Sequence, residues 1–246
     1  MTRLLASVKD EHEAEVALHG GADIIDFKDP AQGALGALAP HVIAGGLRRV
    51  AGRALTSATA GDWPLQPAIL TQAVQRTGDT GVDYVKVGLL PGAALEACLE
   101  ALALLAVRHR IVAVFFADRG VPMHALDKLR RAGFAGVMLD TFDKRGGGLC
   151  QNLSNDRLRA FVESGRSLGL MTGLAGSLRI EDIPLLAPIN PDLLGFRGAL
   201  CDSGARNSAL CVERVQRIRA TLDAGCGSRQ GISPAPGTRS GTPPPG

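Results

Sequence analysis

The sequence predicts a (β/α)8 barrel, an α/β fold in which eight parallel strands alternate with helices. Short apolar or β-branched runs alternate eight times with longer stretches of helical period. These units occupy about 224 residues, which suits a compact barrel. A doubly wound open sheet is the alternative fold, but the first predicted strand leads into Ser7-Val8-Lys9-Asp10 rather than the G-x-G-x-x-G turn typical of that fold.

Each predicted strand is a short run rich in aliphatic residues and bounded by glycine or polar residues. The runs are 4–8, 24–28, 55–59, 84–89, 111–117, 136–141, 171–176 and 193–198. The predicted helices are 10–20, 40–50, 66–80, 91–108, 122–132, 155–167, 179–187 and 208–223. Several of them begin near a proline, which helix N-termini favour (Pro40, Pro67, Pro91 and Pro122). In such a barrel, the carboxyl ends of the strands and the loops after them build the active site.

The composition predicts one barrel domain over residues 1–224 and a tail over 225–246. The tail holds six Gly and five Pro and offers little apolar surface to bury, so it is predicted to be disordered. Lys and Arg number 27 against 24 Asp and Glu. This near balance argues against a nucleic-acid or membrane-surface partner held by bulk charge.

Membrane, export and metal-binding signals are not found in the sequence. The longest apolar stretch, 93–107, is interrupted by two glutamates and falls short of the ~20 residues of a membrane span. The N-terminus lacks the apolar region of a secretory signal, so a cytoplasmic location is expected. Five cysteines never occur in C-x-x-C spacing and five histidines are scattered, so we expect free thiols and no metal site.

The lysines are the most informative residues, because the chain has 22 Arg but only 5 Lys. Arginine stays protonated, whereas a lysine amine can lose its proton and attack a carbonyl. Lys28, Lys86 and Lys144 lie at or just after the ends of predicted strands, while Lys9 and Lys128 do not. If the first three converge at the barrel mouth, each ammonium favours the neutral form of its neighbours. The alternative is that each lysine pairs with an acid for structural reasons.

Two carboxylates accompany these lysines. Asp26 precedes Lys28 by two residues, which puts both side chains on one face of the strand. Asp140 ends the sixth predicted strand four residues before Lys144 and repeats the arrangement. We expect Asp26 to hold Lys28 protonated unless Asp26 is itself engaged. Two carboxylate–amine pairs suit a reaction with several proton transfers.

Glycine-containing turns after the last two predicted strands are candidates for phosphate binding. Gly176 ends the seventh run and Ser177 follows it, and Arg197 and Gly198 end the eighth. Barrels commonly hold a phosphate at this place on backbone N–H groups. The alternative reading of each glycine is a tight turn.

Six segments, taken together, resemble one enzyme family along nearly the whole chain before the tail, about residues 4–222. They are GGADIIDFKDPAQGALGA, LTSATAGDWPLQP, DYVKVGL, MLDTFDKRGGGL, GLAGSL and GFRGALCDSGAR, in this order. The chain is similar to the (5-formylfuran-3-yl)methyl phosphate synthases of methanofuran biosynthesis. The resemblance implies condensation of two glyceraldehyde 3-phosphate molecules, with loss of phosphate and water and without a metal or organic cofactor. It also implies that Lys28 is the Schiff-base lysine and Lys86 the proton acceptor, supported by Asp26, Asp140 and Lys144.

Two other functions are left open by the residues. A class I aldolase acting on another sugar phosphate would use the same lysine chemistry and would differ in its product. A non-catalytic phosphate-binding barrel would keep its function without Lys28. The expected partner of the enzyme is a small phosphorylated aldehyde, and a homo-oligomer is left open.

Overall fold

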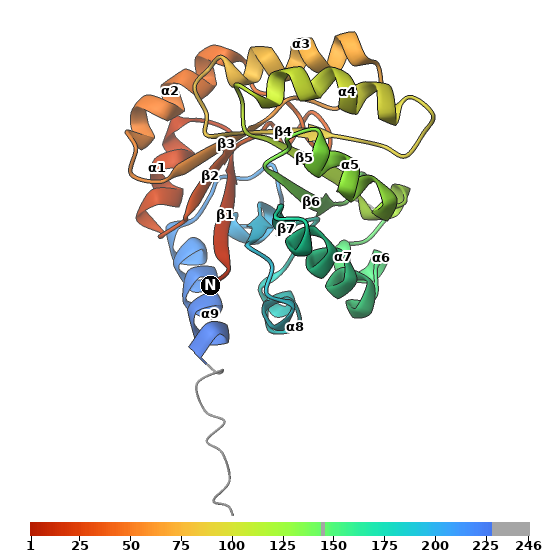
Figure 1. The fold of residues 1–246 in the computed structure, drawn as a ribbon. Helices are drawn as coiled ribbons and strands as arrows, with labels where there is room; N and C mark the ends of the chain where they lie inside the picture. The colour runs from red at the N-terminus through yellow and green to blue at the C-terminus, as the bar shows by residue number, and fades with distance from the viewer. Residues whose placement is uncertain (144–145, 228–246) are drawn as a thin grey trace, which may run out of the picture.

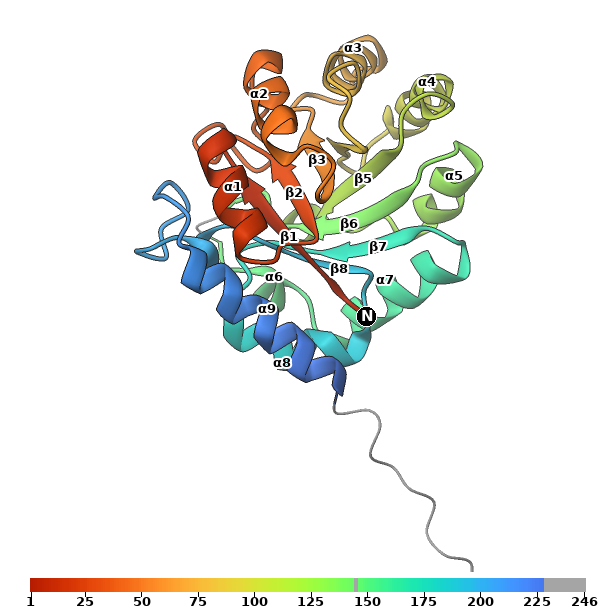
Figure 2. The ribbon, with the colours of Figure 1, turned by 90° about the vertical axis from the view of Figure 1, so that its left-hand side faces the viewer.

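The eight predicted strands close into a parallel barrel in the computed structural model, which describes residues 1–143 and 146–227. The strands follow one another around the barrel in chain order, and β8 pairs with β1 to close it. Figure 1 shows the fold from the side, and Figure 2 shows the helices arranged around the strands. The (β/α)8 prediction is confirmed, and the open doubly wound sheet is excluded by the β1–β8 pairing.

The observed elements follow the predicted order, with most strands shorter than predicted, the predicted helix over 179–187 divided, and one short helix, α6, that was not predicted. The strands are β1 (Arg3–Val8), β2 (Ile24–Phe27), β3 (Leu55–Thr59), β4 (Tyr84–Gly88), β5 (Ile111–Phe116), β6 (Gly136–Asp140), β7 (Met171–Leu174) and β8 (Leu193–Phe196). The helices are α1 (Glu11–His19), α2 (Pro40–Val50), α3 (Pro67–Gly78), α4 (Leu95–Ala106), α5 (Leu126–Arg131), α6 (Leu149–Asn152), α7 (Asn155–Ser167), α8 (Ile183–Leu186) and α9 (Val212–Gly227).

Backbone conformation explains where the predictions differ from the structure. β7 ends before Gly176, whose φ of +109° is incompatible with a strand, and β8 ends before Arg197, whose ψ is −70°. The helix predicted over 179–187 is instead α8 between two 3-10 turns, because Pro184 and Pro188 lack the N–H of a continuous helix. Helix α9 continues to Gly227, past the predicted domain boundary at 224, and the rest of the predicted tail lies outside the described residues.

Sequence signals at the starts of α1, α2 and α3 agree with the structure, whereas α4 and α5 begin four residues after Pro91 and Pro122. Asp10 caps α1, because its carboxylate accepts a hydrogen bond from the backbone N–H of Glu13 at 2.8 Å. Pro40 and Pro67 occupy the first turns of α2 and α3, where the missing N–H costs nothing. These residues fix the starts of the helices, and so the ends of the loops that follow β1, β2 and β3. Those loops lie on the side of the barrel that carries the site.

Aspartates hold neighbouring strands in register at the amino ends of the barrel. Asp23, Asp83 and Asp192, which precede β2, β4 and β8, accept hydrogen bonds from backbone N–H groups at the starts of β1, β3 and β7. The carboxylates of Asp83 and Asp192 also accept threonine hydroxyls. These residues lie at the end of the barrel that stabilises the fold, away from the carboxyl ends of the strands.

The interior of the barrel changes from apolar to polar along its axis. An apolar cluster fills the amino-terminal part and includes Leu5, Ile24, Val112, Met138 and Leu193. A second, larger cluster packs between the outer face of the barrel and the helices. Because side chains alternate along a strand, the inward positions two residues beyond Leu5 and Ile24 are Ser7 and Asp26. The polar part of the interior therefore begins near the carboxyl ends of the strands.

Candidate active site

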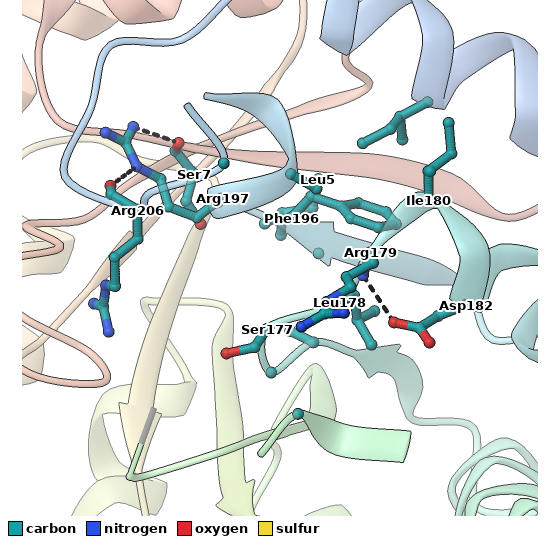
Figure 3. Close-up of a pocket in the computed structure, with 18 of the residues that line it drawn as sticks. Leu5, Ser7, Ser177, Leu178, Arg179, Ile180, Asp182, Phe196, Arg197 and Arg206 are labelled. Carbon is teal, nitrogen blue, oxygen red and sulfur yellow. Dashed lines mark hydrogen bonds between the residues drawn. The ribbon is translucent and has the colours of Figure 1, made fainter. Parts of the chain in front are cut away.

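A cavity of about 860 Å³ opens at the carboxyl ends of the strands. Its lining includes Lys28, Lys86 and Asp140, together with the loops that follow β7 and β8. Figure 3 shows two sides of this cavity, with Ser177 and Arg179 on one side and Arg197 and Arg206 on the other. The cavity therefore lies where barrel enzymes carry their active sites.

Lys86 forms a buried ion pair with Asp26 inside the barrel. The Lys86 Nζ atom lies 2.6 Å from Asp26 Oδ2, although the two residues stand on β4 and β2. The hydroxyls of Ser7 and Ser57 donate to the two oxygens of Asp26 at 2.9 and 2.6 Å. Asp26 is 0% exposed and Lys86 4% exposed, so water does not compete for this pair. The carboxylate is thus held in one orientation by an amine and two hydroxyls.

Lys28 faces a different carboxylate, that of Asp140. Lys28 Nζ lies 3.7 Å from Asp140 Oδ2, which links the end of β2 to the end of β6 across the barrel mouth. The backbone N–H of Thr141 donates to the other oxygen of Asp140 at 2.7 Å. Both charged side chains are buried, at 6% and 5% exposure. Two lysine–carboxylate pairs therefore border one cavity.

For Asp26, the pairing differs from the one that sequence neighbours suggest. The sequence leads us to expect Asp26 to pair with Lys28, and Asp140 with Lys144. In the structure Asp26 is engaged by Lys86 and the two serine hydroxyls, and Asp140 lies beside Lys28. Lys144 lies outside the described residues. Lys28 thus does not pair with Asp26, although both stand on the same strand face two residues apart.

The two loops that are candidates for phosphate binding, after β7 and β8, both line the cavity. Gly176 and Ser177 both have positive φ angles, +109° and +53°. A Cβ at Gly176 would lie 3.0 Å from the backbone nitrogen of Thr141, so this turn has no room for a side chain. Gly198 follows β8, begins a 3-10 turn and also lines the cavity. Among the described residues, the N–H groups of Gly176, Ser177 and Gly198 have no acceptor.

The side chain of Arg197 holds the fold together and leaves no donor for a ligand. Its guanidinium forms a buried ion pair with Glu13 of α1 through both terminal nitrogens. It also donates to the backbone oxygens of Ser7 at 3.1 Å, Arg206 at 2.7 Å and Ser208 at 2.9 Å. These bonds use all five N–H donors of an arginine. A phosphate at this position would be bound by the backbone, and side-chain binding by Arg197 is not supported.

Two further residues at the site escaped the sequence analysis. Arg206, in the β8–α9 loop, lines the cavity and donates to the backbone oxygen of Gly33 at 2.7 Å. Burial lowers the pKa of its guanidinium. Asp118 accepts hydrogen bonds from the backbone N–H groups of Phe142 and Asp143 at 2.7 and 2.9 Å, which fixes the turn after β6. No signal distinguished Arg206 among 22 arginines.

Within residues 1–143 and 146–227, no group of three or more His, Cys, Asp or Glu side chains could hold a metal ion. Four cysteines there are free thiols (Cys98, Cys150, Cys201 and Cys211). Burial and the neighbouring Asp182 raise the pKa of the Cys150 thiol to about 11. None of the described helices has the length and apolar character needed to cross a membrane.

A closed eight-stranded parallel barrel with a cavity at the carboxyl ends of its strands places the chain in the class of TIM-type (β/α)8 barrels. Two buried lysine–carboxylate pairs lie at this end of the barrel. The model of the 4-HFC-P synthase family matches residues 4–219, and the chain belongs to this family. The resemblance seen in the sequence is thereby confirmed, and the protein is an enzyme.

Similar proteins agree with this assignment. A homologue from Methylorubrum extorquens is 44% identical over 223 residues, covering 91% of this chain and 92% of the homologue. The (5-formylfuran-3-yl)methyl phosphate synthase of Methanococcus maripaludis strain C6 is 40% identical over 226 residues, covering 87% and 94%. Among solved structures, phosphoribosyl anthranilate isomerase from Thermus thermophilus superposes with a TM-score of 0.65 at 15% identity, covering 91% of this chain and 99% of the isomerase. The last likeness shows the fold alone.

Proposed function

We propose that this enzyme condenses two molecules of glyceraldehyde 3-phosphate into (5-formylfuran-3-yl)methyl phosphate, with Lys28 as the Schiff-base lysine. The observation that carries the proposal is the pair of buried lysine–carboxylate contacts at the cavity, Lys28 with Asp140 and Lys86 with Asp26. The names of the homologues support the product. The reaction belongs to methanofuran biosynthesis, takes place in the cytoplasm and needs no metal or organic cofactor.

Schiff-base formation balances without an external proton. The Lys28 ammonium loses two protons as its nitrogen forms the C=N bond: one passes to Asp140, and the other moves to the former carbonyl oxygen and leaves in water together with a proton from Lys86. Asp140, 3.7 Å from Lys28, receives the first proton while the amine attacks the aldehyde. Lys86 donates a proton to the departing hydroxyl of the carbinolamine. This donation leaves Lys86 neutral, and Asp140 returns its proton in later steps.

The neutral Lys86 amine then removes a proton from the carbon next to the iminium, which gives an enamine. The positive iminium makes this carbon acidic, and Asp26 stabilises the ammonium that forms on Lys86. Loss of phosphate from the enamine and addition to the second aldehyde build the carbon skeleton. Dehydration and ring closure complete the furan, with Asp140 and Lys144 handling protons or phosphate.

The phosphate groups need positions that keep the reacting carbons at Lys28. The backbone N–H groups of Gly176, Ser177 and Gly198 are the first candidates, since they border the cavity and have no acceptor among the described residues. Backbone donors at glycine turns suit a phosphate dianion. One substrate phosphate binds there.

The test uses the purified protein with glyceraldehyde 3-phosphate alone. Mass spectrometry is expected to show the furan phosphate, and borohydride is expected to trap an adduct on the peptide containing Lys28. Lys28→Arg keeps the positive charge and should abolish both signals. A reversible aldol product without furan absorbance would identify an aldolase instead, and an adduct on Lys86 alone would reverse the two lysine assignments.

A further inference from the structure

Arg197 and Arg206 both lie between β8 and α9, but their guanidinium groups form different hydrogen bonds. All five donors of Arg197 are satisfied by Glu13 and by backbone oxygens. Arg206 lies nine residues further on and also lines the cavity. Among the described residues, the Gly33 oxygen is the one hydrogen-bond acceptor of its guanidinium. Arg206 therefore retains donors that Arg197 does not have.

The surroundings of Arg206 favour an anion. The Arg206 side chain is half-buried, and this burial lowers the pKa of its guanidinium. Asp29, Asp62 and Asp140 act on it electrostatically, yet none forms an ion pair with it within the described chain. A partly desolvated arginine with spare donors binds phosphate well, because its planar fork matches two phosphate oxygens.

The position of Arg206 is set by the fold. The Arg197 Nε group donates to the backbone oxygen of Arg206, and Figure 3 shows the Arg206 side chain extending away from Arg197. The bond to Gly33 places its guanidinium at the β2–α2 loop, beside the strand that leads to Lys28. The backbone donors of Gly176 and Ser177 follow β7, at another part of the rim. The cavity thus has two separate places that suit a phosphate.

We propose that the Arg206 guanidinium binds the phosphate of the second aldehyde molecule, while the loop amides after β7 and β8 bind the phosphate of the molecule attached to Lys28. This inference rests on the proposed function, since it requires two phosphorylated aldehydes in one cavity. The cavity volume of about 860 Å³ gives room for both. Arg206 is then a binding residue for one of two identical substrates.

The experiment separates the two substrate molecules. Borohydride trapping on Lys28 needs only the first molecule, whereas furan formation needs both. In Arg206→Gln, the glyceraldehyde 3-phosphate concentration for half-maximal trapping should stay within about twofold of wild type. The KM for furan formation should rise by about 10- to 100-fold, the size of one charge-assisted hydrogen-bonded contact. Arg206→Lys keeps a cation and should lose less.

Arg157→Gln is the matched control, because Arg157 is an exposed arginine on α7 that does not line the cavity. It should change neither trapping nor furan formation. The inference is wrong if Arg206→Gln lowers trapping and furan formation together, since the residue would then serve the first molecule or only support the loops. Unchanged furan formation in Arg206→Gln would also overturn it. If the wild type gives neither adduct nor furan, the proposed function itself fails.

Discussion

Replacing Arg197 by methionine tests whether this residue stabilises the fold through its side chain. The substitution removes five hydrogen bonds and leaves the Glu13 carboxylate, which is 1% exposed, without its main counter-charge. Lys9 remains near Glu13, with its backbone N–H at 2.9 Å and its Nζ atom at 3.6 Å. Breaking a buried ion pair on one side costs about 3–5 kcal/mol. For a domain of this size, this loss lowers Tm by about 6–20 °C.

The assay is urea unfolding of the wild type, Arg197→Met, Glu13→Leu and the double variant, with the slope of unfolding free energy against urea checked in each. The double variant should be no less stable than Arg197→Met alone, because it buries no unpaired charge. A loss below about 1 kcal/mol in Arg197→Met would refute the reasoning, given the size expected for a broken buried pair. So would a double variant that loses the sum of the two single losses.

Three further predictions concern the site and the C-terminus. Lys86→Arg should lower the rate of furan formation by about 10²- to 10⁴-fold, because it removes a general base. Lys9→Arg and Lys128→Arg should stay within about threefold of wild type, since charge alone suffices in their ion pairs with glutamates. Similar losses in all three variants would contradict the lysine argument. Gly198→Val brings a side chain to within 3.0 Å of the Gly204 oxygen. It should raise the KM by about tenfold, because the hydrogen bond from the backbone N–H to the substrate phosphate is lost. An unchanged KM and unchanged inhibition by phosphate would rule out a phosphate there. Removal of residues 228–246 should leave Tm and activity nearly unchanged, and a fall in Tm above about 5 °C would show that the tail docks on the barrel.

The strand pattern could be predicted because each strand faces the barrel interior on one side and the helices on the other. This double burial produces the short apolar runs that the sequence shows. The division of the predicted 179–187 helix was missed because two prolines at 184 and 188 each restart the turn.

The lysine–carboxylate pairs could be predicted as a group but not as partners. Inward side chains of alternate strands share one layer of a barrel, so β2, β4 and β6 bring their polar residues together. Lys86 on β4 thus reaches Asp26 on β2, and Asp140 on β6 faces Lys28. Distance along the chain suggested that Asp26 would pair with Lys28. Arg206 lies on a loop without periodicity, where no residue pattern indicates which side chain turns inward.

The strands and the loops carry different parts of the site, and this affects how the substrate specificity of the barrel can be altered. Lys28, Lys86 and their carboxylates lie on or directly beside strand ends fixed by the barrel, whereas Gly176, Gly198 and Arg206 lie on loops. Replacement of the loops leaves the amine groups in register, because the strand hydrogen bonds and not the loops position them. New specificities for other carbonyl compounds are therefore best sought by grafting or randomising the β7–α8 and β8–α9 loops on an unaltered barrel, with Arg197 kept because its buried ion pair with Glu13 stabilises the fold.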